Sequence, residues 1–533
     1  MNPYLMERVK KDTPELNADI ANGLATRDIK GAESYIDSVF RAAAKDFPPG
    51  LEYLGCRRCT PQEEFDSDNI KNTKKKVDIA KSDIYAMQYK FRYNGVDLPT
   101  RYIFLPFVRD GGAFNLGGPT FFVSPILSDI ILSYEHDNIF VKLLRDKFAI
   151  RRFTHNVIID SQVQTVAFAW ASLYHFTANK APIRTYKAYT TLVHYLVCKY
   201  GFYETLKRFA DCEPHVSDEA FDTKDYPPSE WVVIRSMQHK PKTYPRAMKY
   251  LGSELRIAVK RTEFTPLVRT ILGTLFYTID HFPDRIKAEY IDNKGLWKVL
   301  LGHLIFGSFP SEGKLHDDVD EHIRSLDEYI DDIVKSRFET IGFDIDSIFE
   351  FFAIATKDFN DWLLTANTRS NSLYTKEVSV LLDLLMPITS RIFTFHFKIK
   401  SALKKRISEK DVINAFNKHL KARSVFKLTG RINGVSNFSY SGDNKCFKIT
   451  SVVVPQKSTH GASNKEAQKL NDPTKRLHVS LAEVGSFINL SDTNITGENK
   501  INPHIRLDEH GWIIRDEKKK ALLDSVQAII QRN

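Results

Sequence analysis

The chain has 533 residues, and its 76 Lys and Arg exceed its 66 Asp and Glu by a formal net charge of +10. This length allows about two to four domains with cores of their own. The content of 42% hydrophobic and 27% charged residues is typical of an ordinary soluble globular protein. The positive balance favours polyanionic partners.

Targeting signals are not evident. The N-terminal residues lack a positive segment followed by an apolar core, so we expect no signal peptide. The most apolar runs, 192–198 and 271–279, are too short and too interrupted to span a bilayer. Five scattered cysteines are typical of a reducing compartment. We therefore expect a cytoplasmic protein without a membrane partner, located in the host cytoplasm if viral.

The first elements are predicted to be packing helices. Thr13-Pro14 resembles a helix start with proline at the first helical position. A second helix is expected after Thr26, because apolar residues from Ile29 to Phe47 recur at three- and four-residue spacing. Pro48-Pro49-Gly50 should end it.

Cys56 and Cys59 have the spacing of half a structural zinc site. Such a site needs four ligands, and the chain has no second Cys-x-x-Cys. Two reduced thiols near a turn are the favoured interpretation, and we predict no metal or other cofactor.

The clearest strand pattern runs from Tyr85 to Tyr93, where aromatic and other side chains alternate. Asn94-Gly95 then supplies the residues of a two-residue hairpin turn, since both central positions take positive φ. Arg101–Val108 should be the next strand, followed by short strands around Phe114 and Phe121.

Gly112 and Gly117 have the four-residue gap of a phosphate-binding loop, but the Lys-Ser/Thr that should follow is replaced by Gly118-Pro119-Thr120. Proline also removes a backbone N–H that such a loop uses. These glycines therefore favour hairpin turns.

A helix is expected from Ser124-Pro125 to about Tyr134, and then a basic hairpin over 139–153. Cations that alternate with aromatic residues on strands can bind single-stranded nucleic acid, because bases stack on rings while cations hold phosphates. A solvated hairpin whose aromatic residues face a core is the alternative. The hairpin residues that we predict to contact nucleic acid are Arg145, Lys147, Arg151 and Arg152.

From residue 162 to about 420 the chain is predicted to be mostly helical. Proline- and glycine-containing loops separate the segments, and no fixed-period repeat indicates a solenoid. The expected helices are 162–176, 183–210, 265–281, 296–307, 319–339, 346–364, 376–390 and 409–422.

Two charged segments stand out. Residues 312–332 hold nine Asp or Glu against two basic residues, a net charge of −7. Residues 398–427 hold ten Lys or Arg against Glu409 and Asp411, which places +8 of the chain's +10 in thirty residues. Below, these are the acidic segment and the basic segment.

The sequence also allows a metal site that could support phosphoryl transfer. Asp280 and His281 from one helix could join His316, Asp317 and Asp320 from another, because residues 316 and 320 share a helix face. Acidic residues also gather at helix starts for dipole reasons alone. No kinase, dinucleotide or nucleophile-elbow motif was found.

In the basic segment, Ser408 begins a predicted helix whose apolar face includes Val412, Phe416 and Leu420. Cations lie off that face, so one side can be buried while the other meets phosphates. The residues that we predict to contact nucleic acid are Lys398, Lys400, Lys404, Lys405, Arg406, Lys418, Lys421, Arg423 and Lys427.

We predict an α+β protein with three domains. Residues 1–160 form an N-terminal α+β domain with antiparallel hairpins, 161–425 a large helical domain ending in the basic helix, and 426–533 a small β-rich domain with a terminal helix. The predicted function is nucleic-acid binding, to DNA or RNA, in a transcription or replication assembly with protein partners.

The composition, rich in Lys, Ile, Asn and Phe, favours a large phage as the source of the protein. One alternative is a structural or assembly protein whose acidic and basic segments dock on each other or on protein partners. The other is the metal-dependent enzyme.

Overall fold

The computed structural model of the chain has two compact units, one formed by residues 1–130 and 371–533 and the other by residues 131–370. The predicted three-domain division is not tested by this grouping and stays a prediction. The structure describes residues 24–45, 47–64, 83–107, 113–115, 120–123, 126–135, 138–143, 147–171, 173, 190–237, 252–306, 311–369, 372–379, 388–389, 391–392, 394–396, 399, 409–420, 423–425, 435–437, 454–457, 479–485, 498–499, 502, 505–508 and 511–532.

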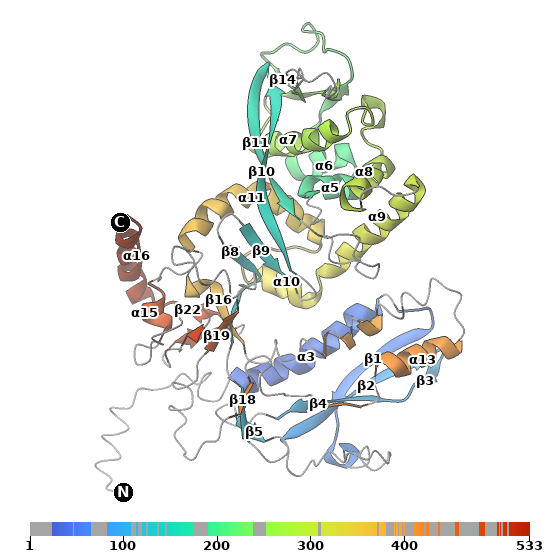
Figure 1. Cartoon of the computed structure of the whole chain (residues 1–533), viewed down its shortest axis with the longest axis vertical. Coiled ribbons are helices and arrows are strands. Elements are labelled where there is room, and N and C mark those ends of the chain that lie inside the picture. Colours follow the sequence, from blue (N-terminus) through green and yellow to red (C-terminus); the bar gives the residue numbers. More distant parts are fainter. Residues whose placement is uncertain are drawn as a thin grey trace, which may run out of the picture. The chain divides into compact units, whose positions relative to one another are not determined.

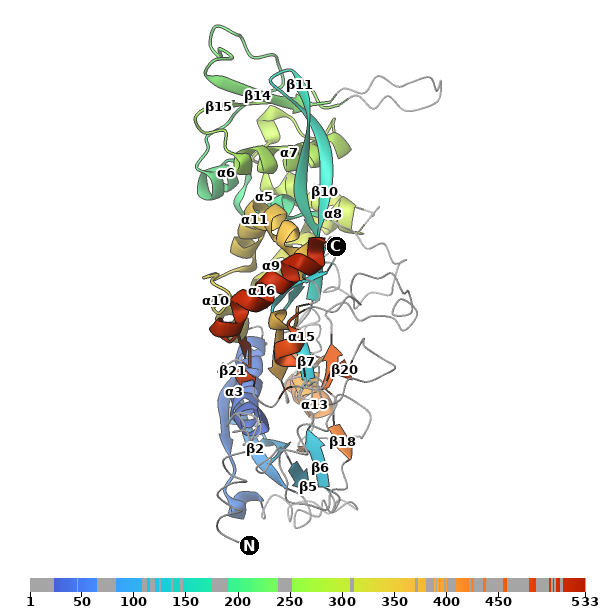
Figure 2. The ribbon, with the colours of Figure 1, turned by 90° about the vertical axis from the view of Figure 1, so that its left-hand side faces the viewer.

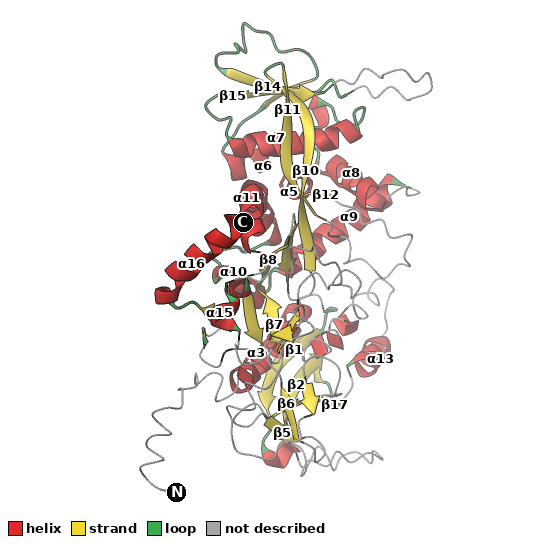
Figure 3. Ribbon diagram, turned by 60° about the vertical axis from the view of Figure 1, so that its left-hand side comes forward, coloured by secondary structure: helices red, strands yellow, loops and turns green. Residues whose placement is uncertain are grey.

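Helices and antiparallel sheets occur in both units, which confirms the α+β class (Figure 3). No helix among the described residues is long and apolar enough to cross a membrane.

The main sheet of the first unit has the strand order β1-β2-β4-β17. β17 is parallel to β4, and the other neighbours are antiparallel (Figure 1). The short strand β3 pairs with β2 across the predicted Asn94-Gly95 turn, where the two residues have φ of 48° and 80°. This confirms the hairpin. The strands are β1 (Leu51–Arg58), β2 (Ile84–Tyr93), β3 (Val96–Asp97), β4 (Arg101–Pro106) and β17 (Arg423–Val425).

Helix α3 (Leu24–Ala44) covers one face of this sheet. The ring of Phe40 lies 5.2 Å from that of Tyr53, 5.1 Å from that of Tyr89 and 5.4 Å from that of Phe91. The predicted apolar face is therefore confirmed as a packing surface.

The remaining strands of the first unit pair segments that are far apart in sequence. β6 and β7 precede residue 130, yet they pair with β18, β16 and β19, which follow residue 375. The antiparallel pair β5–β6 confirms the two short strands predicted around Phe114 and Phe121. These strands are β5 (Ala113–Asn115), β6 (Thr120–Val123), β7 (Ile126–Asp129), β16 (Lys376–Ser379), β18 (Val435–Asn437), β19 (Val454–Lys457), β20 (Glu498–Asn499), β21 (Arg506–Leu507) and β22 (Ile513–Ile514).

In the second unit, a long ribbon of β10 and β11 runs through an eight-stranded sheet (Figure 2). β9 pairs with the start of β10 and β14 with its end. The strands are β8 (Leu132–Glu135), β9 (Asn138–Lys142), β10 (Lys147–Ile159), β11 (Gln162–Ala171), β12 (Thr190–Thr191), β13 (His215–Ser217), β14 (Trp231–Ser236) and β15 (Arg256–Lys260).

Helices pack on this sheet around one large apolar core. α7 lies so close to β11 that a Cβ added at Gly273 would come within 2.6 Å of the Val166 side chain. Its start agrees with prediction, since Thr265 caps the backbone N–H of Val268 and Pro266 is the first helical residue. The helices are α5 (Leu192–Tyr200), α6 (Phe202–Ala210), α7 (Pro266–His281), α8 (Lys294–Phe306), α9 (Glu312–Leu326), α10 (Asp332–Glu339) and α11 (Ile348–Arg369), with 3₁₀ turns at Ala288–Tyr290 and Asp327–Tyr329.

Two predicted helices are divided in the structure: the described part of 183–210 holds strand β12 and then α5 and α6, which are separated at Gly201, and 319–339 holds the end of α9, a 3₁₀ turn and α10. Three others are wrong in whole or in part. The segment 162–176 begins as strand β11, and the segment from Ser124 to Tyr134 contains strands β7 and β8. The segment 376–390 begins as strand β16. In each case pairing with a distant or neighbouring strand outweighs a helix-like apolar spacing.

Candidate nucleic-acid interface

Helix α13 (Glu409–His419) lies in the basic segment and packs on the main sheet of the first unit (Figure 1). Its buried residues Val412 and Phe416, with Leu420 just beyond its end, recur every four positions, as predicted. The Phe416 ring lies 5.0 Å from that of Phe91 on β2 and 5.6 Å from that of Phe395, both at steep angles. These aromatic contacts fix one side of the helix against the sheet.

The opposite side of α13 is polar and faces solvent. Lys410 and Lys418 are exposed, and so are Asp411, Asn414 and Asn417. The two lysines lie eight residues apart and therefore on the same side of the helix, near opposite ends. Of these, Lys418 was predicted to contact nucleic acid.

A buried cation lies beneath this helix. Arg101, the first residue of β4, is only 3% exposed. Its guanidinium lies 4.4 Å from the centre of the Phe416 ring and donates a hydrogen bond to the side-chain oxygen of Asn417. Its Nε has no hydrogen-bond partner among the residues that the structure describes. Burial lowers the pKa of this guanidinium, but an arginine keeps its charge in a protein.

Among the described residues, no carboxylate forms an ion pair with Arg101, and its recorded contacts are those with Phe416 and Asn417. Sequence reasoning missed this residue, because nothing in the linear pattern distinguishes a buried arginine from an ordinary one at a strand start. The helix that carries Lys410 and Lys418 thus covers a third positive charge.

The structure brings one further predicted residue to this region. Arg423 begins β17, and its backbone pairs with that of Tyr102, next to Arg101. The other predicted residues of the basic segment lie outside the described residues: Lys398, Lys400, Lys404, Lys405, Arg406, Lys421 and Lys427.

The predicted basic hairpin exists, as β9 and β10 pair antiparallel with Lys142 opposite Lys147. Arg151 and Arg152 are exposed on β10. Lys147 lies on the same strand, whereas Arg145 lies outside the described residues.

The aromatic residues of this hairpin mostly belong to the core. Phe140 and Phe148 are buried, and the Phe148 ring lies 6.3 Å from that of Phe352. Only Phe153 is partly exposed, in edge contact with Trp170 at 4.4 Å between ring centres. For Phe140 and Phe148 the core-packing alternative is therefore correct.

The proposed metal ligands are engaged with other groups. Asp280 is 2.8 Å from Nε2 of His155, and Asp320 forms ion pairs with Lys298 and Arg324. Among the described residues there is no group of three His, Cys, Asp or Glu that could hold a metal ion.

Burial raises the pKa of both Cys56 and Cys59 to about 11. Both thiols are therefore protonated at neutral pH, as expected for two reduced thiols.

No curated protein matches the chain. A family model described as a non-virion RNA polymerase subunit matches residues 3–514, which is nearly the whole sequence and includes both units. The chain therefore belongs to the non-virion RNA polymerase subunit family, and it is a component of a viral transcription assembly.

Proposed function

We propose that this subunit binds nucleic acid within its transcription assembly and that the solvent side of α13 holds backbone phosphates. The observation that carries the proposal is the set of positive charges at this helix. Lys410 and Lys418 are exposed on it, and the buried Arg101 beneath it pairs with no carboxylate of the described residues.

The buried guanidinium matters because a charge removed from water is unfavourable unless an opposite charge compensates it. Stacking on Phe416 and one bond to Asn417 compensate only part of that cost. An anion bound on α13 would compensate the remaining cost of burying the Arg101 charge. Arg101 is too buried to contact that anion itself, so it acts through its field and by fixing the Asn417 side of the helix.

Phosphate contacts made by lysine carry little sequence information, since lysine acts as a point charge. We therefore expect α13 to supply affinity and orientation, not base specificity. The predicted cations that flank α13 in sequence extend the same surface in this proposal: Lys398, Lys400, Lys404, Lys405, Arg406, Lys421, Arg423 and Lys427.

A secondary contact is proposed on β10. Arg151 is exposed, and its register partner on β11 is the partly exposed Trp170, so both side chains lie on one face of the ribbon. An exposed arginine beside an aromatic ring can hold a phosphate while a base stacks on the ring. Arg152 lies on the other face and would contribute charge only.

The test is a double charge reversal, Lys410→Glu with Lys418→Glu, in the full-length chain. Binding to short labelled single-stranded DNA, duplex DNA and RNA is followed by fluorescence anisotropy. Two lost phosphate contacts should weaken binding roughly 10- to 100-fold near 0.1 M salt. The helix should tolerate the change, because a glutamate near its N-terminus is favourable and one near its C-terminus is unfavourable by a similar amount.

The matched control is Lys287→Glu with Lys357→Glu, two exposed lysines of the second unit that form no ion pair with any described residue. This control changes the net charge of the chain by the same amount as the α13 variant. Equal weakening by both variants would show that only overall charge matters, and unchanged affinity of the α13 variant would remove α13 from the interface.

A further inference from the structure

Helix α16 (Glu517–Arg532) of the first unit has an apolar stripe that remains open to solvent. Leu522, Val526 and Ile529 are 65%, 39% and 60% exposed. Their spacing of four and three residues places them on one side of the helix. The helix also lies beyond residue 514, where the match to the family model ends.

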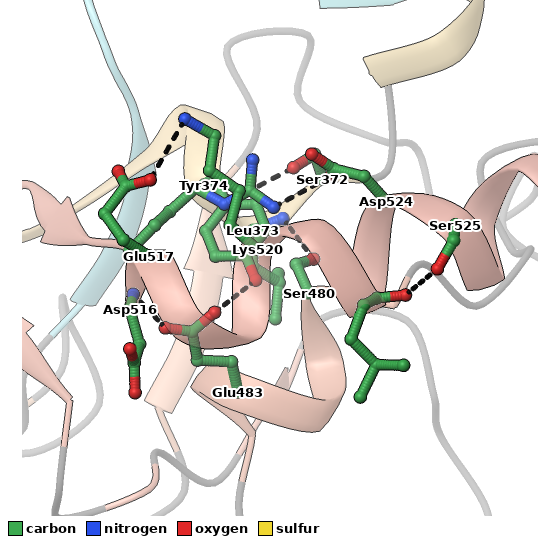
Figure 4. A network of polar contacts seen from close by, with 12 residues as sticks. Ser372, Leu373, Tyr374, Ser480, Glu483, Asp516, Glu517, Lys520, Asp524 and Ser525 are labelled. Atoms are coloured by element: carbon green, nitrogen blue, oxygen red, sulfur yellow. Dashed lines mark hydrogen bonds and ion pairs between the residues drawn. The ribbon is translucent and has the colours of Figure 1, made fainter.

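The helix is held from its other side and from its start (Figure 4). Arg515 donates to Asp524 at 2.9 Å and stacks on the ring of Tyr374, with 4.1 Å between guanidinium and ring centre. Asp524 is two residues from Leu522, or about 200° around the helix, so the contact between Arg515 and Asp524 lies on the side away from the stripe.

A second set of hydrogen bonds holds the first turn of α16. Glu483, in the short helix α15 (Leu481–Val484), accepts a bond from the backbone N–H of Asp516 at 2.8 Å and another from the Tyr374 hydroxyl. Asp516 in turn accepts from the backbone N–H of Lys518 at 3.0 Å. The stripe is thus presented by an anchored helix.

Charged side chains of both signs lie at the start of α16. Lys518, Lys519 and Lys520 occupy its first turn together with Glu517, and the ion pairs Lys519–Asp516 at 3.8 Å and Lys520–Glu517 at 3.6 Å offset the unfavourable dipole position of two of the lysines. Lys518 and Lys519 precede Leu522 by four and three residues, so both border the apolar stripe. Lys518 is exposed and forms no ion pair with the described residues, so it leaves a positive charge beside the open apolar stripe that suits a partner surface with carboxylates.

We propose that this face of α16 docks on another protein subunit of the polymerase, in an apolar groove with carboxylates at the end that meets Lys518 and Lys519. Membership of a polymerase subunit family supplies the partner class, and charge complementarity selects the acidic groove. The inference is independent of nucleic-acid binding by α13.

A second copy of this chain fits poorly. In a parallel pair the lysines of one helix would face those of the other, and in an antiparallel pair they would face the end that carries Arg532. Like charges placed opposite each other are unfavourable in either arrangement.

The experiment compares two double variants of the full-length tagged chain, co-expressed with the other polymerase subunits of its virus. Leu522→Asp with Ile529→Asp alters the stripe. Ala521→Asp with Ala528→Asp adds the same two charges at the same seven-residue spacing on another side, at exposed positions. We expect the stripe variant to lose at least tenfold in the amount of one co-purifying subunit, while the control retains it.

A photo-crosslinking residue at position 526 of the assembled polymerase identifies what covers the stripe. A crosslink to a segment of another subunit that contains carboxylates and apolar residues supports the proposal. It is overturned if both variants retain every subunit, if both lose the same subunit equally, if the crosslink joins two copies of this chain, or if the stripe variant only loses binding to anionic vesicles.

Discussion

The acidic and basic segments carry almost equal and opposite charge, but their surroundings differ. In the acidic segment, carboxylates find partners within the second unit: Glu312 pairs with Arg285, Asp320 with Lys298, Asp327 with Lys199, and Asp331 caps the start of α10. In the basic segment, the described lysines of α13 face solvent and Arg101 beneath them lacks a paired carboxylate among the described residues.

This difference shows that a run of like charge in a sequence does not by itself indicate a need for an external partner. The acidic segment has satisfied many of its charges locally. The basic segment has the composition of a binding surface, and the environment of its described lysines, Lys410 and Lys418, leaves them positive. The predicted docking of the two segments on each other is not tested and stays an alternative.

The largest expected effect comes from reversing Lys404, Lys405 and Arg406 to glutamate. If all three contact phosphates, affinity for any nucleic-acid sequence should fall by a factor of several hundred near 0.1 M salt, or about 3–4 kcal/mol. Anisotropy titrations with two unrelated sequences measure it.

A variant of the acidic segment tests whether net charge alone controls binding. Asp317→Asn with Asp318→Asn removes two negative charges from α9. A protein that bound only by net charge would bind more tightly after this change. We expect no change, and a gain in affinity would contradict the assignment to the basic segment.

Acid should destabilise the unit that holds the acidic segment. His322 of α9 and His194 of α5 are fully buried, and burial lowers the pKa of each to about 4. Between pH 6.5 and about 4 the unfolded chain binds these protons and the folded chain does not. The free energy of unfolding should therefore decrease as the pH is lowered from 6.5 to about 4, by up to about 1.4 kcal/mol per pH unit for each histidine.

Urea unfolding followed by tryptophan fluorescence measures this loss, because four of the five tryptophans (170, 231, 297 and 362) lie in the second unit. His322→Gln should reduce the pH slope by about half. An unchanged slope in that variant would mean that other groups cause the acid sensitivity. Below about pH 4, Glu312 and Asp320, whose pKa values are lowered by Arg285 and Lys298, should add to the loss.

Replacing Arg101 with methionine should have a smaller effect on binding. The aliphatic side chain can fill the space over Phe416, and exchange of a buried charge for an apolar group is often neutral for stability. Affinity should fall roughly two- to tenfold, since the guanidinium acts through its field. A large drop in thermal stability with unchanged affinity would indicate a purely structural arginine.

The smallest effect is expected at Asp320. Its pairs with Lys298 and Arg324 are partly exposed, so Asp320→Asn should cost at most about 1 kcal/mol. Differential scanning fluorimetry and the same anisotropy titration test this, and we expect unchanged binding. A loss of nucleic-acid binding here would revive a functional role for this carboxylate.

Local sequence signals predicted part of the fold. Asn94-Gly95 specified the β2–β3 turn, because this pattern acts through the backbone of adjacent residues, and the helix predicted over 265–281 agrees with α7. Strand β11 was mistaken for a helix. The turn before it uses Asp160 and Ser161 at φ of 48° and 67°, without the glycine that usually marks such a hairpin.

Long-range pairing could not be predicted in the same way. β7 and β16 have neighbours far away in the chain, and a short apolar run has no sequence mark of such a partner. For the candidate site, the sequence indicated α13 and its buried side. It could not indicate Arg101, whose importance depends on what surrounds it after folding.

The most direct test of the central claim is the salt dependence of binding by the full-length chain and by the Lys410→Glu, Lys418→Glu variant. We predict that the logarithm of the affinity falls linearly with the logarithm of the salt concentration. The slope should be smaller in the variant by roughly 0.7–0.9 for each lost contact. Equal slopes for the two proteins, or no binding at any salt concentration, would contradict the account.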